Sequence, residues 1–149
     1  MTIPNHLALG LIIGKATGSY EIAVATSVLL DCDHFIPLAK HGLLKNFKVF
    51  WSSIIKPEDR FGDQRGILHN ILAVFATTLF SYFLFGPHVA LVVGLSHFGH
   101  IFLDMISDTD SRLFRPFSDF KTRGFIPYYS RYEVLFFLGL VLIFLVLPA

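Results

Sequence analysis

The sequence has little of what a secreted or soluble domain usually contains. Cys32 is the only cysteine among 149 residues, so an internal disulfide is excluded and the fold does not require an oxidising compartment. Charged residues are also scarce, at 15% of the chain, whereas apolar residues make up 54% and the mean hydropathy is +0.62. No basic residue precedes Lys15, so the apolar N-terminus lacks the positively charged start of a signal peptide and is expected to remain as the first helix. We therefore expect residues 1–149 to form a single integral membrane domain.

Five apolar segments organise the chain, and the last four approach the length of about 20 residues that a membrane-spanning helix needs. Tight turns at Ser19-Tyr20 and Gly86-Pro87 predict two helix hairpins. Glycines at every fourth residue of the first segment predict a close contact with a neighbouring helix. The predicted fold class is all-α, a polytopic membrane bundle of four to five transmembrane helices with interfacial helical loops. The segments are Ile3–Gly18, Glu21–Leu38, Gly66–Phe85, His88–Ser107 and Glu133–Leu147.

Positive charge is concentrated in two long connections, Ala39–Arg65 and Asp108–Tyr132, which hold eleven of the twelve lysines and arginines. The positive-inside rule places both connections in the cytoplasm. Phe47, Phe50 and Trp51 recur at helical spacing in the first connection and predict an amphipathic helix at the membrane surface. We expect a multi-pass protein of the inner (cytoplasmic) membrane.

Histidine and aspartate recur at helical spacing in the fourth apolar segment. His97, His100 and Asp104 are three and four residues apart, so their side chains project from one helix face. An aspartate at membrane depth costs about 2.5 to 3.5 kcal/mol on insertion scales, and a divalent metal would compensate several such groups together. His100 and Asp104 are candidate ligands, whereas His97 is a candidate ligand or a nearby base.

The same topology places ionisable side chains of other segments at the cytoplasmic ends of their helices. His6 begins the first segment, Asp31, Asp33 and His34 end the second, and His69 begins the third. We expect them to form one layer with the fourth segment, and Asp31 is the stronger ligand candidate of the two aspartates. Nitrogen and oxygen donors of this kind suit zinc first, with manganese or iron as alternatives, better than calcium.

Catalytic roles are also predicted in this layer. His34, His97 or Asp33 is a candidate general base for a metal-activated water. Arg65 lies one helical turn before His69. Its guanidinium is expected either to hold a phosphate or carboxylate of a substrate or to anchor the loop at the membrane surface.

Short motifs along the chain resemble those of a known family. They are Asn5-His6, Asp31-x-Asp33, Arg65-Gly66-x-x-His69 and His100-x-x-x-Asp104, followed by Arg115-Pro116-Phe117-Ser118. In this order they are similar to the LexA-binding, inner-membrane-associated metal-dependent hydrolases of bacteria and archaea. The resemblance covers most of the chain up to Ser118 and implies a LexA-like protein partner. It also implies a metal site drawn from His6, Asp31, Asp33, His69, His100 and Asp104.

These observations predict a membrane-bound metal-dependent hydrolase that acts on a phosphoester, lipid or lipid-linked, at the cytoplasmic membrane face. Membrane lipids are the expected partners, since basic loops attract anionic headgroups. The alternative is a non-catalytic metal-binding or adaptor membrane protein. A proton relay is disfavoured because the outer half of the bundle offers only Glu21 and His88. Nucleic-acid binding is not expected, because acidic residues are mixed with the basic residues of the loops.

Overall fold

The computed structural model describes residues 1–55 and 67–148, and helices form the framework of this part of the chain. No strand occurs among the described residues, so the predicted all-α fold class is confirmed. The helices match the expected apolar segments to within a few residues, except for the start of the third segment. In chain order the elements are α1 (Ile3–Thr17), α2 (Tyr20–Leu29), the 3₁₀ segment η1 (Leu30–His34), α3 (Phe35–Lys40), the 3₁₀ segment η2 (Leu43–Lys45), α4 (Phe47–Ile55), α5 (Ile71–Phe85), α6 (Pro87–Ile106) and α7 (Arg131–Val146).

Two helix hairpins form at the predicted turns. Gly18 ends α1 in the left-handed region with φ 70°, and Gly86 joins α5 to α6 with φ 85°, a conformation that favours glycine. A Cβ atom on Gly10 would lie 2.9 Å from Cα of Val24, so the backbones of α1 and α2 approach closely. Gly10 and Gly14 therefore serve helix packing, as predicted, whereas Gly18 serves the turn and would place its Cβ within 4 Å of no described atom.

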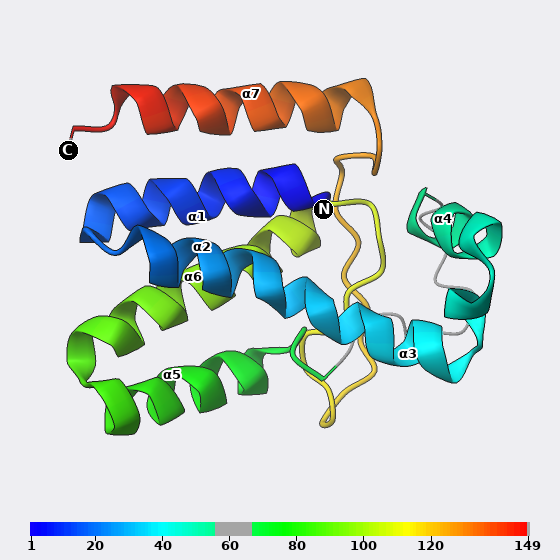
Figure 1. Cartoon of the computed structure of the whole chain (residues 1–149), viewed down its shortest axis with the longest axis horizontal. Coiled ribbons are helices and arrows are strands. Elements are labelled where there is room, and N and C mark those ends of the chain that lie inside the picture. Colours follow the sequence, from blue (N-terminus) through cyan, green and yellow to red (C-terminus); the bar gives the residue numbers. More distant parts are fainter. Residues whose placement is uncertain (56–66, 149) are drawn as a thin grey trace.

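The helices alternate in direction, which gathers particular helix ends on one side of the bundle (Figure 1). α1 packs against α2, α6 and α7, and α6 also packs against α2 and α5. The N-terminal ends of α1, α5 and α7 and the C-terminal ends of α2 and α6 all face the same side, toward the right of Figure 1. Side chains far apart in the sequence meet at this end.

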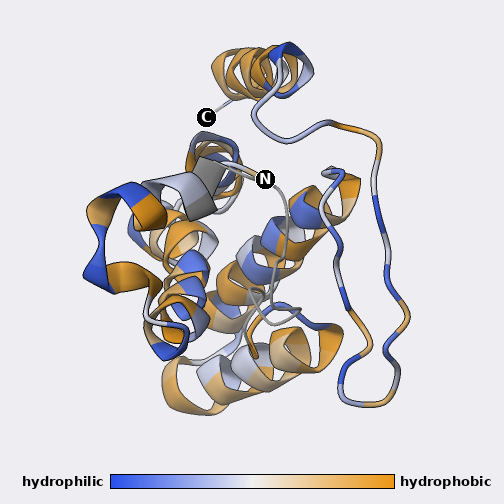
Figure 2. Cartoon of the chain, turned by 90° about the vertical axis from the view of Figure 1, so that its right-hand side faces the viewer, coloured by the Kyte–Doolittle hydropathy of each residue, from blue (hydrophilic) through white to orange (hydrophobic). Residues whose placement is uncertain are grey.

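The outer surface of the bundle is apolar, whereas its largest fully buried side chains include histidines. Phe75 and Phe83 on α5 are 68% and 75% exposed, and Leu145 on α7 is 67% exposed. Figure 2 shows α7, at the top of the view, coloured as hydrophobic along most of its length. His6, His97 and His100 are fully buried. This distribution is the one expected when lipid contacts the outer faces of the helices.

Two helical stretches within the described residues are long enough and apolar enough to cross a membrane, Tyr20–Lys40 and Pro87–Ile106. α5 is apolar but has 15 residues, and α1 and α7 have 15 and 16 residues, fewer than the roughly 20 that span a bilayer. The number of four to five spanning helices therefore stays a prediction. The predicted helix in the first connection is present as α4, and its place at the membrane surface also stays a prediction.

The connection from α6 to α7 folds back onto the end of α6. The backbone N–H of Gly124 donates to the carbonyl of Ser107 at 2.9 Å, and that of Phe125 donates to the carbonyl of Ile106 at 3.0 Å. A Cβ atom on Gly124 would lie 2.2 Å from the backbone of Ile106, so the close approach requires glycine. This return places the start of α7 beside the start of α1 (Figure 1).

Candidate metal centre

Two local features prepare ligand residues at the shared end of the bundle. In η1 the tighter 3₁₀ winding aligns residues three apart, and Asp31 Oδ1 lies 3.4 Å from His34 Nε2. Before α5, the side chain of Asn70 accepts a hydrogen bond from the N–H of Ala73 at 2.8 Å and caps the helix. His69 therefore lies in the turn just before α5, where its ring faces α6.

Four donor atoms from three parts of the chain form what we call the donor cluster: Asp31 Oδ1, His69 Nε2, His100 Nε2 and Asp104 Oδ2. His69 Nε2 lies 3.1 Å from His100 Nε2 and 3.7 Å from Asp31 Oδ1. It lies 3.6 Å from Asp104 Oδ2. His100 Nε2 lies 3.5 Å from Asp31 Oδ1 and 3.9 Å from Asp104 Oδ2.

The separations between the two imidazoles and each carboxylate are close to the edge length of a tetrahedral coordination shell. A zinc ion with nitrogen and oxygen ligands at about 2.1 Å separates its tetrahedral donors by about 3.4 Å. The five separations within the donor cluster run from 3.1 to 3.9 Å. Each carboxylate, together with the two imidazoles, therefore has the spacing of three donors to one divalent metal.

The hydrogen bonds behind the two imidazoles leave both Nε2 atoms as electron-pair donors. Nδ1 of His100 lies 2.7 Å from the carbonyl oxygen of Ser27, and Nδ1 of His69 lies 3.1 Å from Oδ2 of Asp33. Since both oxygens accept, each Nδ1 carries the proton. In the neutral rings two electron pairs then face each other across 3.1 Å. That contact is favourable only with a cation between them, either a proton or a metal ion.

The carboxylates around His69 favour such a positive charge. Burial opposes protonation of this ring, but the hydrogen bonds to Asp31 and Asp33 outweigh burial and raise the pKa of His69 to about 9. The same two carboxylates would stabilise a metal cation at this position.

Asp33, predicted as a ligand, lies behind His69 rather than at the centre of the donor cluster. Its Oδ2 accepts hydrogen bonds from Nδ1 of His69 at 3.1 Å and from the N–H of Leu68 at 3.0 Å. The carboxylate thus fixes both the tautomer and the orientation of His69, a common arrangement next to a metal ligand.

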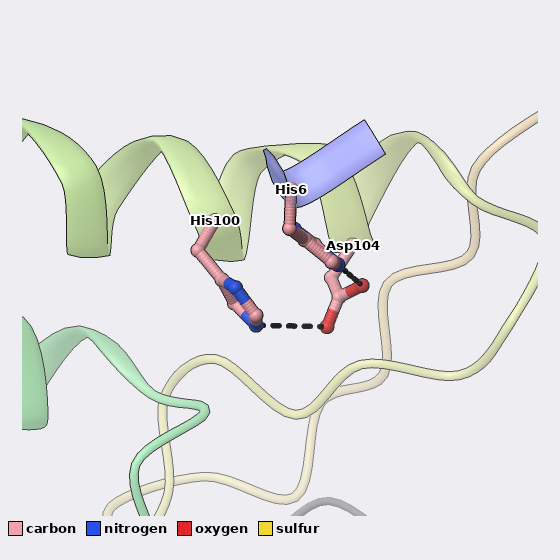
Figure 3. A group of neighbouring side chains, drawn as sticks. All are labelled: His6, His100 and Asp104. Carbon is pink, nitrogen blue, oxygen red and sulfur yellow. Dashed lines mark ion pairs between the residues drawn. The ribbon is translucent and has the colours of Figure 1, made fainter. Parts of the chain in front are cut away.

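His6 lies against the donor cluster but makes no hydrogen bond to the described part of the chain. Its ring is fully buried and stacks on that of His100, with centroids 3.8 Å apart and an interplanar angle of 18°. Nε2 of His6 lies 3.5 Å from Oδ1 of Asp104 (Figure 3). The amino group of Met1 donates to the same oxygen. A buried polar group without a hydrogen bond costs about 1–3 kcal/mol, so a further partner is expected for the imidazole of His6.

Asp31 and His34 form the exposed edge of the site. The side chain of His34 is 31% exposed and that of Asp31 is 18% exposed, whereas the side chains of His69, His100 and Asp104 are 0–5% exposed. A molecule arriving from outside therefore meets Asp31 and His34 first. The base role that the sequence suggested for His34 stays a prediction.

His97 is turned toward other partners. Its Nε2 donates to the carbonyl oxygen of Leu68 at 2.8 Å, and its Nδ1 lies 2.8 Å from the hydroxyl of Thr77. Both ring nitrogens are therefore engaged, and His97 supports the turn that carries His69. Arg65, the third residue predicted for catalysis, lies outside the described residues.

Sequence reasoning missed Glu133, a carboxylate that is 3% exposed at the start of α7. It accepts hydrogen bonds from the N–H of Thr2 at 2.7 Å, from the side chain of Asn5 at 3.2 Å and from the N–H of Tyr129 at 2.7 Å. These contacts fix the first turn of α1, in which Asn5 directly precedes His6. The available signal was a lone carboxylate in an otherwise apolar segment. Ser27 contributes a backbone carbonyl, which no side-chain pattern reveals.

Comparison with known proteins gives one family. A sequence model described as YdjM inner membrane protein matches residues 1–148. No curated protein and no solved structure gives a significant match.

Proposed function

The chain belongs to the YdjM inner membrane protein family, and we propose that it is a membrane-bound, metal-dependent hydrolase with its site at the cytoplasmic membrane face. The main support is the contact between Nε2 of His69 and Nε2 of His100 at 3.1 Å, with both Nδ1 protons committed elsewhere. Carboxylates of Asp31 and Asp104 complete the donor cluster. The donor set suits zinc first, and manganese or iron as alternatives.

Each residue of the site has a distinct proposed task. Asp31, His69, His100 and Asp104 would hold the metal, which when bound polarises an ester and lowers the pKa of water toward about 7. Asp33 holds the ring of His69. His34 is the proposed general base for the attacking water, since it lies beside Asp31 on the exposed edge.

The proposed substrate is a phosphoester, lipid or lipid-linked. The connection between α6 and α7 contains Arg112, Arg115, Lys121 and Arg123, and basic residues near a membrane attract anionic headgroups. Exposed aromatic side chains of the same connection, such as Phe117 at 82% and Phe125 at 80%, suit the membrane interface. The LexA-like partner implied by the sequence resemblance and the roles of Arg65 stay predictions.

One observation favours the alternative, a non-catalytic metal-binding protein. Catalytic zinc usually has three protein ligands and one open position, whereas the donor cluster supplies four. Under the hydrolase proposal Asp31 is the ligand that yields to water or substrate, because it is the most exposed of the four. Under the alternative all four ligands stay bound.

The test is metal analysis of the detergent-purified protein after loading with zinc or manganese. We expect stoichiometric metal in the wild type and its loss in His100→Ala and Asp104→Ala. His88→Ala is the matched control, because His88 is exposed and bonds only to Ser19 among the described contacts, at 2.9 Å. A screen for phosphodiester and lipid hydrolysis follows. Metal without hydrolysis would favour the alternative, and absence of metal from the wild type would overturn both proposals.

A further inference from the structure

His6 is not among the four residues that form the donor cluster. Its ring is fully buried, and neither nitrogen has a hydrogen-bond partner among the described residues. The equally buried His97 offers a direct comparison, since both of its ring nitrogens contact oxygen atoms at 2.8 Å. Buried imidazoles normally have such partners. A ring that lacks them, and whose Nε2 points at a carboxylate, is placed as a metal ligand would be.

Asp104 faces two sides. Its Oδ2 lies 3.6 Å from His69 Nε2 and 3.9 Å from His100 Nε2, within the donor cluster. Its Oδ1 lies 3.5 Å from His6 Nε2 (Figure 3). This 3.5 Å separation is again close to the distance between two donors of one metal ion. A carboxylate with one oxygen on each side is able to bridge two cations.

The ring spacing agrees with such a bridge. The rings of His6 and His100 are stacked 3.8 Å apart and nearly parallel, and each faces a different oxygen of Asp104 in Figure 3. Metal ions that share a carboxylate in two-metal sites are about 3.5–4 Å apart. Two parallel imidazoles at this spacing would each act as a ligand to one of the two ions.

We propose that the site binds two divalent cations, with the second held by Nε2 of His6 and Oδ1 of Asp104. This proposal rests on the proposed metal centre. Zinc or manganese is the expected ion, and oxygen atoms of water or substrate would fill its remaining positions. With only two side-chain donors, the second position binds metal more weakly than the donor cluster does. Two adjacent cations suit a phosphoester, whose two free oxygens can each contact one ion.

The amino group of Met1 is the competing cation at this position. It donates to Oδ1 of Asp104, so it already compensates that oxygen. A second metal must displace it. If the amine is retained instead, the centre holds one ion and His6 only lines it.

The experiment titrates the full-length, chelator-treated protein with Mn²⁺ in detergent and measures bound metal and the electron paramagnetic resonance spectrum. We expect two equivalents in the wild type, the second weaker, with exchange coupling between neighbouring Mn²⁺ ions. His6→Ala should bind one equivalent without coupling, whereas the control His88→Ala should behave as the wild type. Circular dichroism and gel filtration check the fold of each variant.

The outcomes separate this proposal from the one on which it rests. One equivalent in the wild type, lost in His100→Ala, would overturn the second cation and leave the proposed metal centre intact. No equivalent would overturn both. If His6→Ala does not fold, the wild-type stoichiometry and the presence or absence of exchange coupling decide the question.

Discussion

Replacing Asp33 tests whether this residue orients the metal ligand His69 or is itself a metal ligand. Its Oδ2 accepts from Nδ1 of His69 at 3.1 Å and from the N–H of Leu68 at 3.0 Å. In Asp33→Asn the amide oxygen can accept both hydrogen bonds, so only the negative charge is lost. In Asp33→Ala both donors lose their acceptor and the ring of His69 is free to turn.

The expected magnitudes follow from these contacts. Mutation of a residue that orients a metal ligand weakens metal binding by about 10–100-fold. We expect Asp33→Asn to lie near the lower limit and Asp33→Ala near the upper limit. These factors correspond to about 1.4 and 2.7 kcal/mol of binding free energy.

Competition with a chromophoric zinc chelator in detergent would measure the affinities. Asp110→Asn is the matched control, because it removes the same charge from a surface ion pair with Lys121 at 2.8 Å. Wild-type affinity in Asp33→Ala would refute the orienting role. Loss of metal in Asp33→Asn as complete as in His100→Ala would show that Asp33 is itself a ligand, as the sequence motif suggested.

Two further predictions concern the fold that holds the site, and both are checked by thermal unfolding in detergent followed by circular dichroism. Gly10→Ala should destabilise the protein by about 1–3 kcal/mol, because the new Cβ would lie 2.9 Å from Cα of Val24. The control is Gly139→Ala, whose Cβ would lie in open space, and it should leave stability unchanged or raise it by up to about 1 kcal/mol. Equal melting temperatures would contradict the close helix contact. Glu133→Ala should lower the free energy of unfolding by about 2–4 kcal/mol, since three donors lose their carboxyl acceptor, and the exposed Glu21→Ala is its control. A Glu133→Ala variant that melts with the control would show that these hydrogen bonds contribute little.

Long apolar runs between turn residues made the helices predictable. The fourth segment, expected over His88–Ser107, forms α6 over Pro87–Ile106. The third segment shows where the pattern fails. Hydropathy places its start at Gly66, but the helix begins at Ile71 because the side chain of Asn70 caps it. A cap depends on backbone geometry, which mean hydropathy does not register.

The gathering of His and Asp side chains followed from topology, because short hairpins force neighbouring helices to alternate in direction. Their individual contacts did not follow. His97 and His100 are three residues apart on one helix face, and spacing alone gives them similar roles. The structure separates them through partners remote in the sequence: the hydroxyl of Thr77 engages His97, and the carbonyl of Ser27 engages His100. Such contacts require the packed helices.

The spread of the site along the chain sets an order for its assembly during synthesis. His6 is made early, but its neighbours His100 and Asp104 on α6 appear only after most of the chain has been translated. Glu133 follows later still, and its carboxylate accepts hydrogen bonds from Thr2 and Asn5 at the beginning of α1. A nascent chain that ends before α6 therefore lacks the site. One that ends before α7 contains the donor cluster but lacks the carboxylate that fixes its first helix.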